Sequence, residues 1–560
     1  MHTPFNLHSR SANVTQSVSP IWKLSEDLLW RIFMTNVNNP QILTPYQYNV
    51  KDHTPRPLEV TRITSQVCRH WRNIILSSTA IWGRLIDFVS FDQKTTHWRD
   101  EVISRSGSSS LLWVVEGETS NYVGAPKATE SRAFLLRFIA DQWNRIEKIF
   151  VNRWSGEDWS FLSRPAPCLS QFEIHTMFDA GASDHPSSLP GNIFADQAPQ
   201  LKSFQMTGAH CDLSLGWTAN LQDLTLGGSF SNQAVFEILS NLPLLQSLDL
   251  YGHIAVPDFE PPIVYLPHLQ TLYIDTCLEY LRHIRPPPGC LFRFRENRDK
   301  ILSRLSRERE LSEMYQNYFA AHHPSSLSLM CTKRRFVLHS GIFEGLARDT
   351  PDMELNFTSH AGIAINSVTY LFQMCSSPLL KEVTRLSMKI LHPRPGLLVA
   401  LKKFSFMLQS LDYLQLDEDT LNILLHWDQE SPCSGIVFPR LQNLKLSHLS
   451  HASEIEGGVS TESRLERFLF HRRQIGAPIK VLDLTHYQDL AVWLLDATRS
   501  LERLDELKGM KVLYRSVDTP GVILHYECGS GHPDVLRLRY GADIARELSD
   551  SMVLNLPYID

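Results

Sequence analysis

The side chains best suited to chemistry lie near the end of the chain, where His525, Cys528 and His532 could supply nitrogen and sulfur ligands to a zinc ion. Residues 529–531, a Gly-Ser-Gly run, predict a turn between them, and no second group of ligands follows nearby. The sequence contains no Walker-type phosphate loop, no GxGxxG, no GxSxG and no HExxH. We therefore predict no metal, no cofactor and no catalytic residues, and expect a chain that is not itself an enzyme.

Two apolar stripes near the N-terminus favour binding instead. In residues 24–33, Ser25 can cap a helix that opens with Glu26 and Asp27, where carboxylates favour the helix dipole. Apolar residues then recur there at a spacing of three to four, and they do so again in residues 63–75. Ordinary core is the simpler interpretation of any one such helix. The two stripes together exceed what one short helical pair can bury, so we expect part of this surface to contact a partner.

The order of residue types in these segments resembles a known motif. Residues 65–69, Ser-Gln-Val-Cys-Arg, with Trp71, Arg72 and the later Trp82, resemble an F-box, by which substrate receptors of Skp–cullin–F-box ubiquitin ligases bind the Skp adaptor. Residues 97–107 resemble the segment that usually follows the box in F-box proteins of mushroom-forming fungi. The resemblance covers about residues 20–115 well and the remainder only in style.

This resemblance implies an all-helical domain that docks on the Skp adaptor and, through it, on a cullin. Ser25 stands where the family usually has proline, and the connection over residues 36–57 is longer than usual. Such a loop is tolerable because closure costs only about 0.6 kcal/mol per doubling of length. The sequence cannot divide the candidate residues between the adaptor-facing surface and the core of the box. By resemblance, they are Leu24, Leu28, Leu29, Ile32, Phe33, Ile63, Val67, Cys68, Trp71 and Ile74.

Past residue 140 one short pattern recurs: an apolar residue, two others, then apolar-x-apolar. The three copies that begin at Leu221, Leu245 and Leu269 are each 24 residues apart, within the range expected for leucine-rich repeats. We predict that each copy forms a short strand and that stacking buries leucines which a single copy leaves exposed. A non-solenoid α/β domain is the alternative. The other copies begin at Leu169, Leu201, Val383, Leu411, Leu441 and Ile479, with Ile146 as a possible earlier one.

The outward positions of these strands predict a second binding surface. Solenoids of this kind usually bind partners there, and we expect a protein substrate. Tyrosines can anchor a partner, while the aspartates favour a basic or hydroxyl-rich segment. The alternative is that these residues are merely solvated. The principal candidates are Asp223, Asp249, Tyr251, Tyr273 and Tyr413, together with Thr225, Thr271, Asp275, Gln415, Asp417, Asn443, Lys445 and Asp483.

The repeat pattern breaks between Arg285 and His339. The run Pro286–Gly289 stops regular structure. Apolar spacing over residues 293–319 predicts an amphipathic helix, whose arginines alternate with acidic residues and so favour a solvated face over a nucleic-acid patch. The stretch 286–340 is therefore either an insertion or a degenerate repeat.

Bulk properties limit the remaining possibilities. The chain has 560 residues, a formal net charge of −6 and nine scattered cysteines without a CxxC pair. These values favour a reducing compartment, cytoplasmic or nuclear, and give no reason to expect nucleic-acid or membrane binding. Residues 1–20 do not resemble a secretory signal, and no run is apolar enough for a transmembrane helix.

The predicted fold class is α/β, an N-terminal all-helical F-box followed by an irregular leucine-rich-repeat solenoid. The predicted parts are a disordered tail (1–19), the F-box domain (20–90), a connecting segment (91–145), the first half of the repeats (146–285), the insertion or degenerate repeat (286–340), and the second half with a C-terminal cap (341–560).

Overall fold

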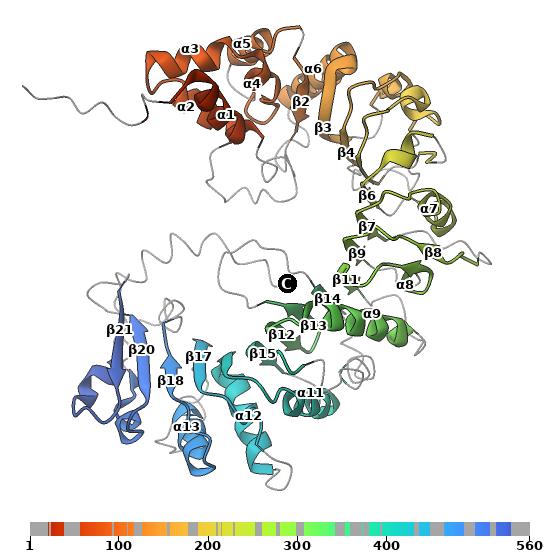
Figure 1. Cartoon of the computed structure of the whole chain (residues 1–560). Helices are drawn as coiled ribbons and strands as arrows, with labels where there is room; N and C mark the ends of the chain where they lie inside the picture. The colour runs from red at the N-terminus through yellow and green to blue at the C-terminus, as the bar shows by residue number, and fades with distance from the viewer. Residues whose placement is uncertain are drawn as a thin grey trace, which may run out of the picture. The chain divides into compact units, whose positions relative to one another are not determined.

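The structure, a computed structural model, is a mixed α/β protein whose strand pairs are mostly parallel (Figure 1). It divides into two compact units, Met1–Ile174 with Gln197–Gln200, and His175–Asp196 with Leu201–Asp560. The described residues are 21, 24–38, 56–91, 95–108, 110–116, 126–153, 157–176, 189–208, 211–213, 216–227, 230–252, 260–275, 280–297, 307–341, 353–358, 372, 380–392, 395–430, 436–448, 464–485, 499–515 and 522–538. The predicted tail therefore lies outside the description.

The first unit begins with short helices. Ser25 caps the first of them as predicted, because its Oγ accepts a hydrogen bond from the backbone N of Leu28 at 3.3 Å. The apolar residues between 63 and 75 lie on two helices rather than on one. The break occurs where Cys68 adopts an extended conformation and its Sγ caps the next helix by accepting from Trp71 N at 3.5 Å. The helices are α1 (Glu26–Val37), α2 (Pro57–Thr64), α3 (Arg69–Ser77), α4 (Thr79–Gly83), α5 (His97–Arg105) and α6 (Pro126–Gln142).

Short parallel strands complete this unit. Strand β2 (Leu112–Val115) pairs in parallel with both β1 (Ile86–Asp87) and β3 (Ile146–Arg153). At the start of β4 (Gln171–Thr176), Ser170 N donates to the Glu147 carbonyl at 2.8 Å. The predicted boundary between residues 145 and 146 thus falls inside the first compact unit.

The second unit contains one long series of paired strands. Pairing is parallel except that β13 runs antiparallel to both its neighbours and β21 runs antiparallel to β20. The order is β5 (Ser203–Thr207), β6 (Asp223–Leu226), β7 (Ser247–Tyr251), β9 (Thr271–Asp275), β11 (Leu291–Asn297), β14 (Met353–Thr358), β13 (Arg335–Ser340), β12 (Ser326–Thr332), β15 (Arg385–Leu391), β16 (Tyr413–Asp417), β17 (Asn443–His448), β18 (Val481–Asp483), β20 (Lys511–Arg515) and β21 (Ile523–Glu527).

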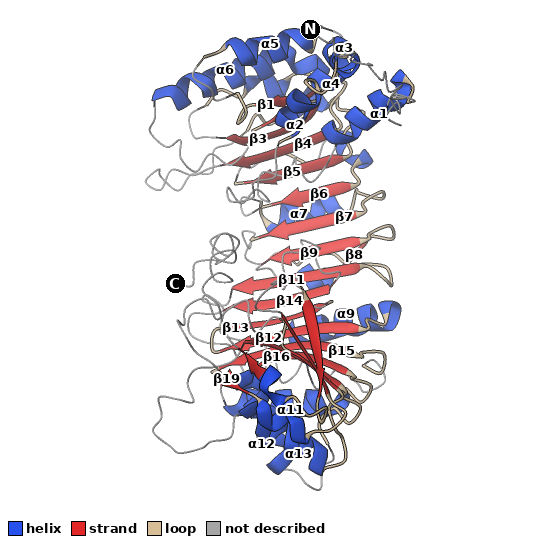
Figure 2. Cartoon of the chain, turned by 90° about the vertical axis from the view of Figure 1, so that its left-hand side faces the viewer, coloured by secondary structure: helices blue, strands red, loops and turns tan. Residues whose placement is uncertain are grey.

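Every copy of the repeated pattern contains a strand, so that prediction is confirmed. Alternation along each strand places leucines such as Leu224 and Leu226 in the core, while Asp223 stays exposed. Figure 1 shows the helices of this unit on one face of the strands, and Figure 2 shows β6, β7, β9 and β11 side by side. These helices are α7 (Asn232–Leu239), α8 (Tyr280–His283), α9 (Arg307–His322), α11 (Pro395–Met407), α12 (Glu418–Glu430) and α13 (Arg464–Gln474).

Both units also contain smaller elements. Two short strand pairs are β8 (Val264–Tyr265) with β10 (Ile284–Arg285), and β19 (Arg499–Ser500) with β22 (Arg537–Leu538). The 3-10 helices are η4 (Trp143–Arg145), η5 (Ser160–Ser163), η6 (Ile193–Asp196), η7 (Gly216–Asn220), η11 (Glu502–Glu506) and η12 (Pro533–Leu536). No helix in the described ranges is long and apolar enough to cross a membrane.

The helix predicted over residues 293–319 is wrong in its first part, because residues 291–297 form β11. Buried Phe292 and Phe294 alternate there with Arg293 and Arg295, which is the period of a strand, and β9 offers a parallel partner. Residues 307–319 of the prediction lie in α9, and residues 298–306 lie outside the described ranges. The following strands enter the sheet in reverse order, since β11 pairs with β14 and β12 pairs with β15.

Candidate binding surfaces

The predicted adaptor-binding residues separate by exposure. Leu28 and Ile32 on α1 are 47% and 53% exposed, and Ile63 and Val67, at the end of α2 and in the turn after it, are 52% and 61% exposed. We call these four residues the apolar surface of α1 and α2. The structure thus separates these exposed candidates from those that pack in the core. Of the remaining candidates, Leu29 and Phe33 are buried, and Leu24, Cys68, Trp71 and Ile74 are half-buried.

Contacts with α3 and the following cap set the rotation of α1. The rings of Phe33 and Trp71 meet edge to face with their centroids 5.3 Å apart. Trp30 Nε1 donates a hydrogen bond to Ser78 Oγ at 2.9 Å. Turning Leu28 and Ile32 toward the core would break both contacts, because residues four apart share one helix face. The packing of Trp30 and Phe33 therefore keeps Leu28 and Ile32 exposed.

Polar contacts that sequence reasoning missed hold α2 in place. Asn36 Nδ2 donates to the Pro57 carbonyl and to Thr61 Oγ1, each at 3.1 Å. Arg56 Nη1 lies 2.8 Å from both carboxylate oxygens of Asp87. These side chains flank helix ends but have no distinctive spacing, so only the structure reveals that they fix where Ile63 points.

The predicted substrate residues of β6, β7 and β9 form one cluster on the strand face opposite the helices. The register aligns Asp249 with Tyr273 and aligns Tyr251 with Asp275. The rings of Tyr251 and Tyr273 have centroids 5.1 Å apart, and Tyr273 OH donates to Asp275 Oδ2 at 3.3 Å. Asp223 lies one strand away on β6 and is exposed.

Electrostatics in this tyrosine–aspartate cluster oppose the charged state of the acids. Burial raises the pKa of Asp249 to about 6, Arg293 works against this rise, and the negative charge of Asp223 adds to it. Burial also raises the pKa values of Tyr251 and Tyr273, and partial desolvation by its neighbours raises that of Asp223 although its side chain reaches solvent. Within the described part of the chain, the buried Oδ1 of Asp249 has no hydrogen-bond partner. A charged group held in such surroundings stabilises the fold poorly, and arrangements of this kind concentrate at functional sites.

The expected acidic character of the face ends at β11. The register places Arg293 beside Tyr273, and Arg295 beside Asp275. The guanidinium of Arg293 lies 5.6 Å from the centre of the Tyr273 ring. A partner bound across β7, β9 and β11 would therefore meet carboxylates, aromatic rings and then cations within three strands.

Tyr413 does not belong to this cluster. It lies on β16, and β11, β14, β13, β12 and β15 stand between that strand and β9 in the sheet order. The guanidinium of Arg385 on β15 lies 4.6 Å from the centre of its ring. The five principal candidates thus form one group of four and one separate residue.

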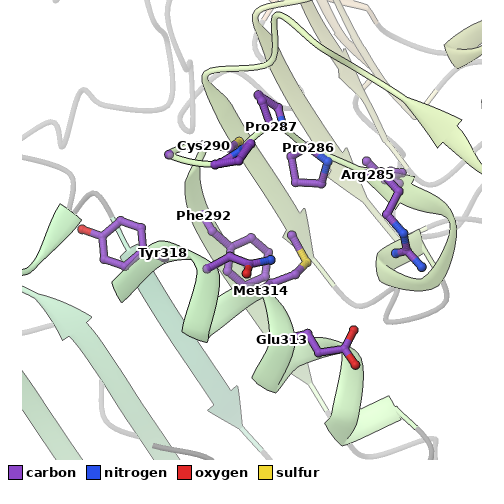
Figure 3. Close-up of a pocket in the computed structure, with 12 residues that line it drawn as sticks. Arg285, Pro286, Pro287, Cys290, Phe292, Glu313, Met314 and Tyr318 are labelled. Atoms are coloured by element: carbon purple, nitrogen blue, oxygen red, sulfur yellow. The ribbon is translucent and has the colours of Figure 1, made fainter. Parts of the chain in front are cut away.

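The second unit contains a hollow of about 310 Å³ between the proline-rich turn, β11 and α9 (Figure 3). Phe292 and Met314 line it, and Figure 3 shows the two side chains between the strand and the helix. Arg285 and Glu313, also in its lining, are exposed and opposite in charge. The hollow therefore has no net charge that would select a partner.

The histidine and cysteine residues near the end of the chain surround a structural turn. His532 N donates to Tyr526 OH at 3.2 Å, and that hydroxyl donates to Asp505 Oδ1 at 2.7 Å. Asp505 also accepts from Gly529 N at 2.5 Å. Across the described ranges, no three His, Cys, Asp or Glu side chains gather in a way that could hold a metal ion.

A comparison with known protein families finds no match to this chain, and a search of curated proteins finds no relative.

Proposed function

We propose that this chain is the substrate-recognition subunit of a Skp–cullin–F-box ubiquitin ligase, with an N-terminal F-box and a C-terminal leucine-rich-repeat-like solenoid. The observation that carries the proposal is the apolar surface of α1 and α2, which lies in the segment whose residue order resembles an F-box. Burying one leucine or isoleucine side chain yields about 1.5–3 kcal/mol. Four such side chains, two on α1 and two at the end of α2 and in the turn after it, therefore favour a stable protein partner over solvent.

The strand face of the second unit would hold the substrate. Its tyrosine–aspartate cluster combines aromatic area with charge, and residues of this kind anchor protein interfaces. The chain itself would transfer no ubiquitin. It would act by proximity, since tethering a substrate beside the catalytic subunits makes the encounter effectively intramolecular. The cytoplasm or nucleus, where such ligases work, is the proposed location.

The alternative is an interaction scaffold that uses the same two surfaces without ubiquitin ligation. Both functions predict adaptor binding, so the discriminating measurement is cullin recovery. Cullin that co-purifies with the full-length chain, and that is lost together with the adaptor, supports the ligase. Adaptor recovered without cullin supports the scaffold.

The adaptor contact is tested with the paired substitution Leu28→Asp and Ile32→Asp in the full-length chain. Both side chains are exposed, so the fold should persist, whereas two buried carboxylates should reduce adaptor affinity by a factor of 100 or more, about 3 kcal/mol. The measurement is titration with purified Skp adaptor, with circular dichroism to confirm folding. Val399→Asp with Val535→Asp, which changes exposed apolar residues of the second unit, is the matched control. Unchanged affinity in the folded Leu28/Ile32 variant would contradict the F-box assignment.

A further inference from the structure

A second hollow in the C-terminal part of the second unit has a different character from the one in Figure 3. Its volume is about 340 Å³, within the range of small binding pockets. Its walls are the last turns of α13, the turn before β18 and the turn before β20. Its lining includes four apolar residues that are buried against neighbouring elements, Leu469, Ile479, Leu507 and Met510, and the exposed Pro478.

Each of the three walls places one cation at this pocket. Arg473 comes from α13, Lys480 precedes β18 and Lys508 precedes β20, and all three residues are exposed. None of the residues lining the pocket is acidic. In the described part of the chain, the ammonium groups of Lys480 and Lys508 form no ion pair, while Arg473 Nη1 donates to the Glu506 carbonyl at 2.6 Å. Three positive charges around one apolar hollow repel one another, and a bound anion would relieve this repulsion.

Neighbouring acids offset the positive charge of this rim only in part. The Asp505 carboxylate, which accepts hydrogen bonds from Tyr526 OH and Gly529 N, attracts Lys508 and offsets part of the charge on that wall. Arg473 and Lys480, in contrast, form no ion pair among the described residues. Glu506 contributes its backbone carbonyl to Arg473, and its side chain is not part of the lining. The positive character of the rim is therefore available to a partner.

The walls of the pocket are held rigidly. The buried Arg472 donates to the carbonyls of Val437 and Phe438 at 2.7 and 3.0 Å, and it lies 3.7 Å from the Asp428 carboxylate. The backbone of the same residue accepts from Ala477 N at 2.9 Å, which fixes the turn between α13 and β18. A preformed pocket loses little conformational entropy on binding.

We propose that this pocket docks a short acidic segment of a partner protein. An apolar side chain of leucine or methionine size would enter the hollow, and flanking carboxylates would meet the three cations. The charge of the rim selects this occupant over a basic or neutral segment. The proposal is independent of the adaptor surface and of the tyrosine–aspartate cluster.

The test pans a random dodecapeptide library, displayed on phage, against the full-length chain. We expect the selected peptides to share an apolar residue flanked by Asp or Glu. In fluorescence anisotropy, the best such peptide should lose about tenfold in affinity for the Lys480→Glu, Lys508→Glu variant. The reason is that each peptide carboxylate would then face a glutamate in place of a lysine, so that attraction becomes repulsion. Lys381→Glu with Lys403→Glu, two exposed lysines elsewhere in the unit, is the matched control and should bind normally.

Three results would overturn the proposal. Selected peptides could lack the acidic–apolar pattern, or the double variant could bind the peptide as the unchanged chain does. A peptide in which serine replaces the apolar residue could bind equally well, which would reduce the contact to nonspecific charge attraction. Vesicles rich in phosphatidylserine provide the comparison with a lipid surface. If they retain the chain through Lys480 and Lys508 while no peptide pattern emerges, the pocket serves a membrane instead.

Discussion

The two candidate surfaces use opposite physical means. The apolar surface of α1 and α2 presents aliphatic side chains to solvent, with the polar groups nearby already paired inside the unit. The tyrosine–aspartate cluster instead presents charged and aromatic groups, one of which lacks a hydrogen-bond partner among the described residues. The apolar surface of α1 and α2 is suited to a single partner that buries apolar area against it. The tyrosine–aspartate cluster is suited to a partner selected by charge and hydrogen bonding.

The largest effect should come from the inward side of α1. Phe33→Ala removes a buried ring that contacts Trp71, and losses of this kind cost about 3–5 kcal/mol. Ile32→Ala, the neighbouring exposed position, should change stability by less than about 0.5 kcal/mol. Hydrogen exchange of peptides from α1 and α3, followed in each full-length variant, measures the loss of stability caused by each substitution. Equal destabilisation by the two substitutions would mean that the apolar surface is core.

The next effect concerns substrate capture. Combined Tyr251→Ala, Tyr273→Ala and Asp249→Lys should reduce recovery of co-purifying substrates at least tenfold, about 1.4 kcal/mol, while adaptor binding stays intact. The measurement is quantitative mass spectrometry after affinity purification from the native cell, with the ligase blocked. Tyr413→Ala, on a separate part of the sheet, is the control. Recovery of the same partners at the same yield would place the substrate surface elsewhere in the chain.

Asp249 should also give stability a pH dependence. Its pKa is higher in the folded chain, about 6, than the ordinary value of 3.8, so the folded state binds more protons between these values. The free energy of unfolding should therefore fall as pH rises from about 4 to about 6 and remain lower above that. Asp249→Asn removes this loss and should stabilise the protein by about 1–3 kcal/mol at neutral pH but hardly at about pH 4.

Urea unfolding of the second unit at the two pH values provides the measurement. Asp412→Asn changes an exposed aspartate of the same unit and is the matched control. If Asp249→Asn destabilises the unit at neutral pH, the charged carboxylate stabilises the fold, and the proposed loss of stability above pH 6 is wrong.

The smallest effect is that of salt. Between about 0.05 and 0.5 M salt, adaptor affinity should change by less than about threefold, because aliphatic contacts are not screened. Substrate capture through the tyrosine–aspartate cluster should weaken over the same range. If adaptor affinity depends more strongly on salt than substrate capture does, the assignment of the two modes is reversed.

The sequence predicted strands β5, β6, β7, β9, β15, β16, β17 and β18 because each follows a local pattern, a leading apolar residue and then alternating apolar residues. It showed no such pattern at β12, β13, β14, β20 and β21. It failed at β11, where the outward positions are arginines and the segment resembles a charged helix. The order β11, β14, β13, β12, β15 could not be predicted, since strand pairing is decided between segments far apart in the chain.

The same distinction applies to the candidate surfaces. The residue types of the adaptor candidates were visible in the sequence, but their division between core and surface depends on contacts such as Phe33 with Trp71. Similarly, the aspartates and tyrosines of the strand face were predicted, whereas the neighbouring arginines were assigned to a helix. Local periodicity identifies which side chains are available, and tertiary contacts decide where they point.

The reversed order of strands β12 to β14 bears on how the protein is made. Leu248 on β7 pairs with Leu272, which leaves the ribosome 24 residues later, whereas Phe292 on β11 pairs with Met353, 61 residues later. At synthesis rates of about 5–20 residues per second, one edge of β11 waits roughly 3–12 seconds for its partner. During that interval a strand carrying Phe292 and Phe294 offers unpaired backbone groups to any extended chain nearby. Nascent chains that stall between these strands are therefore the species we expect to need chaperones most.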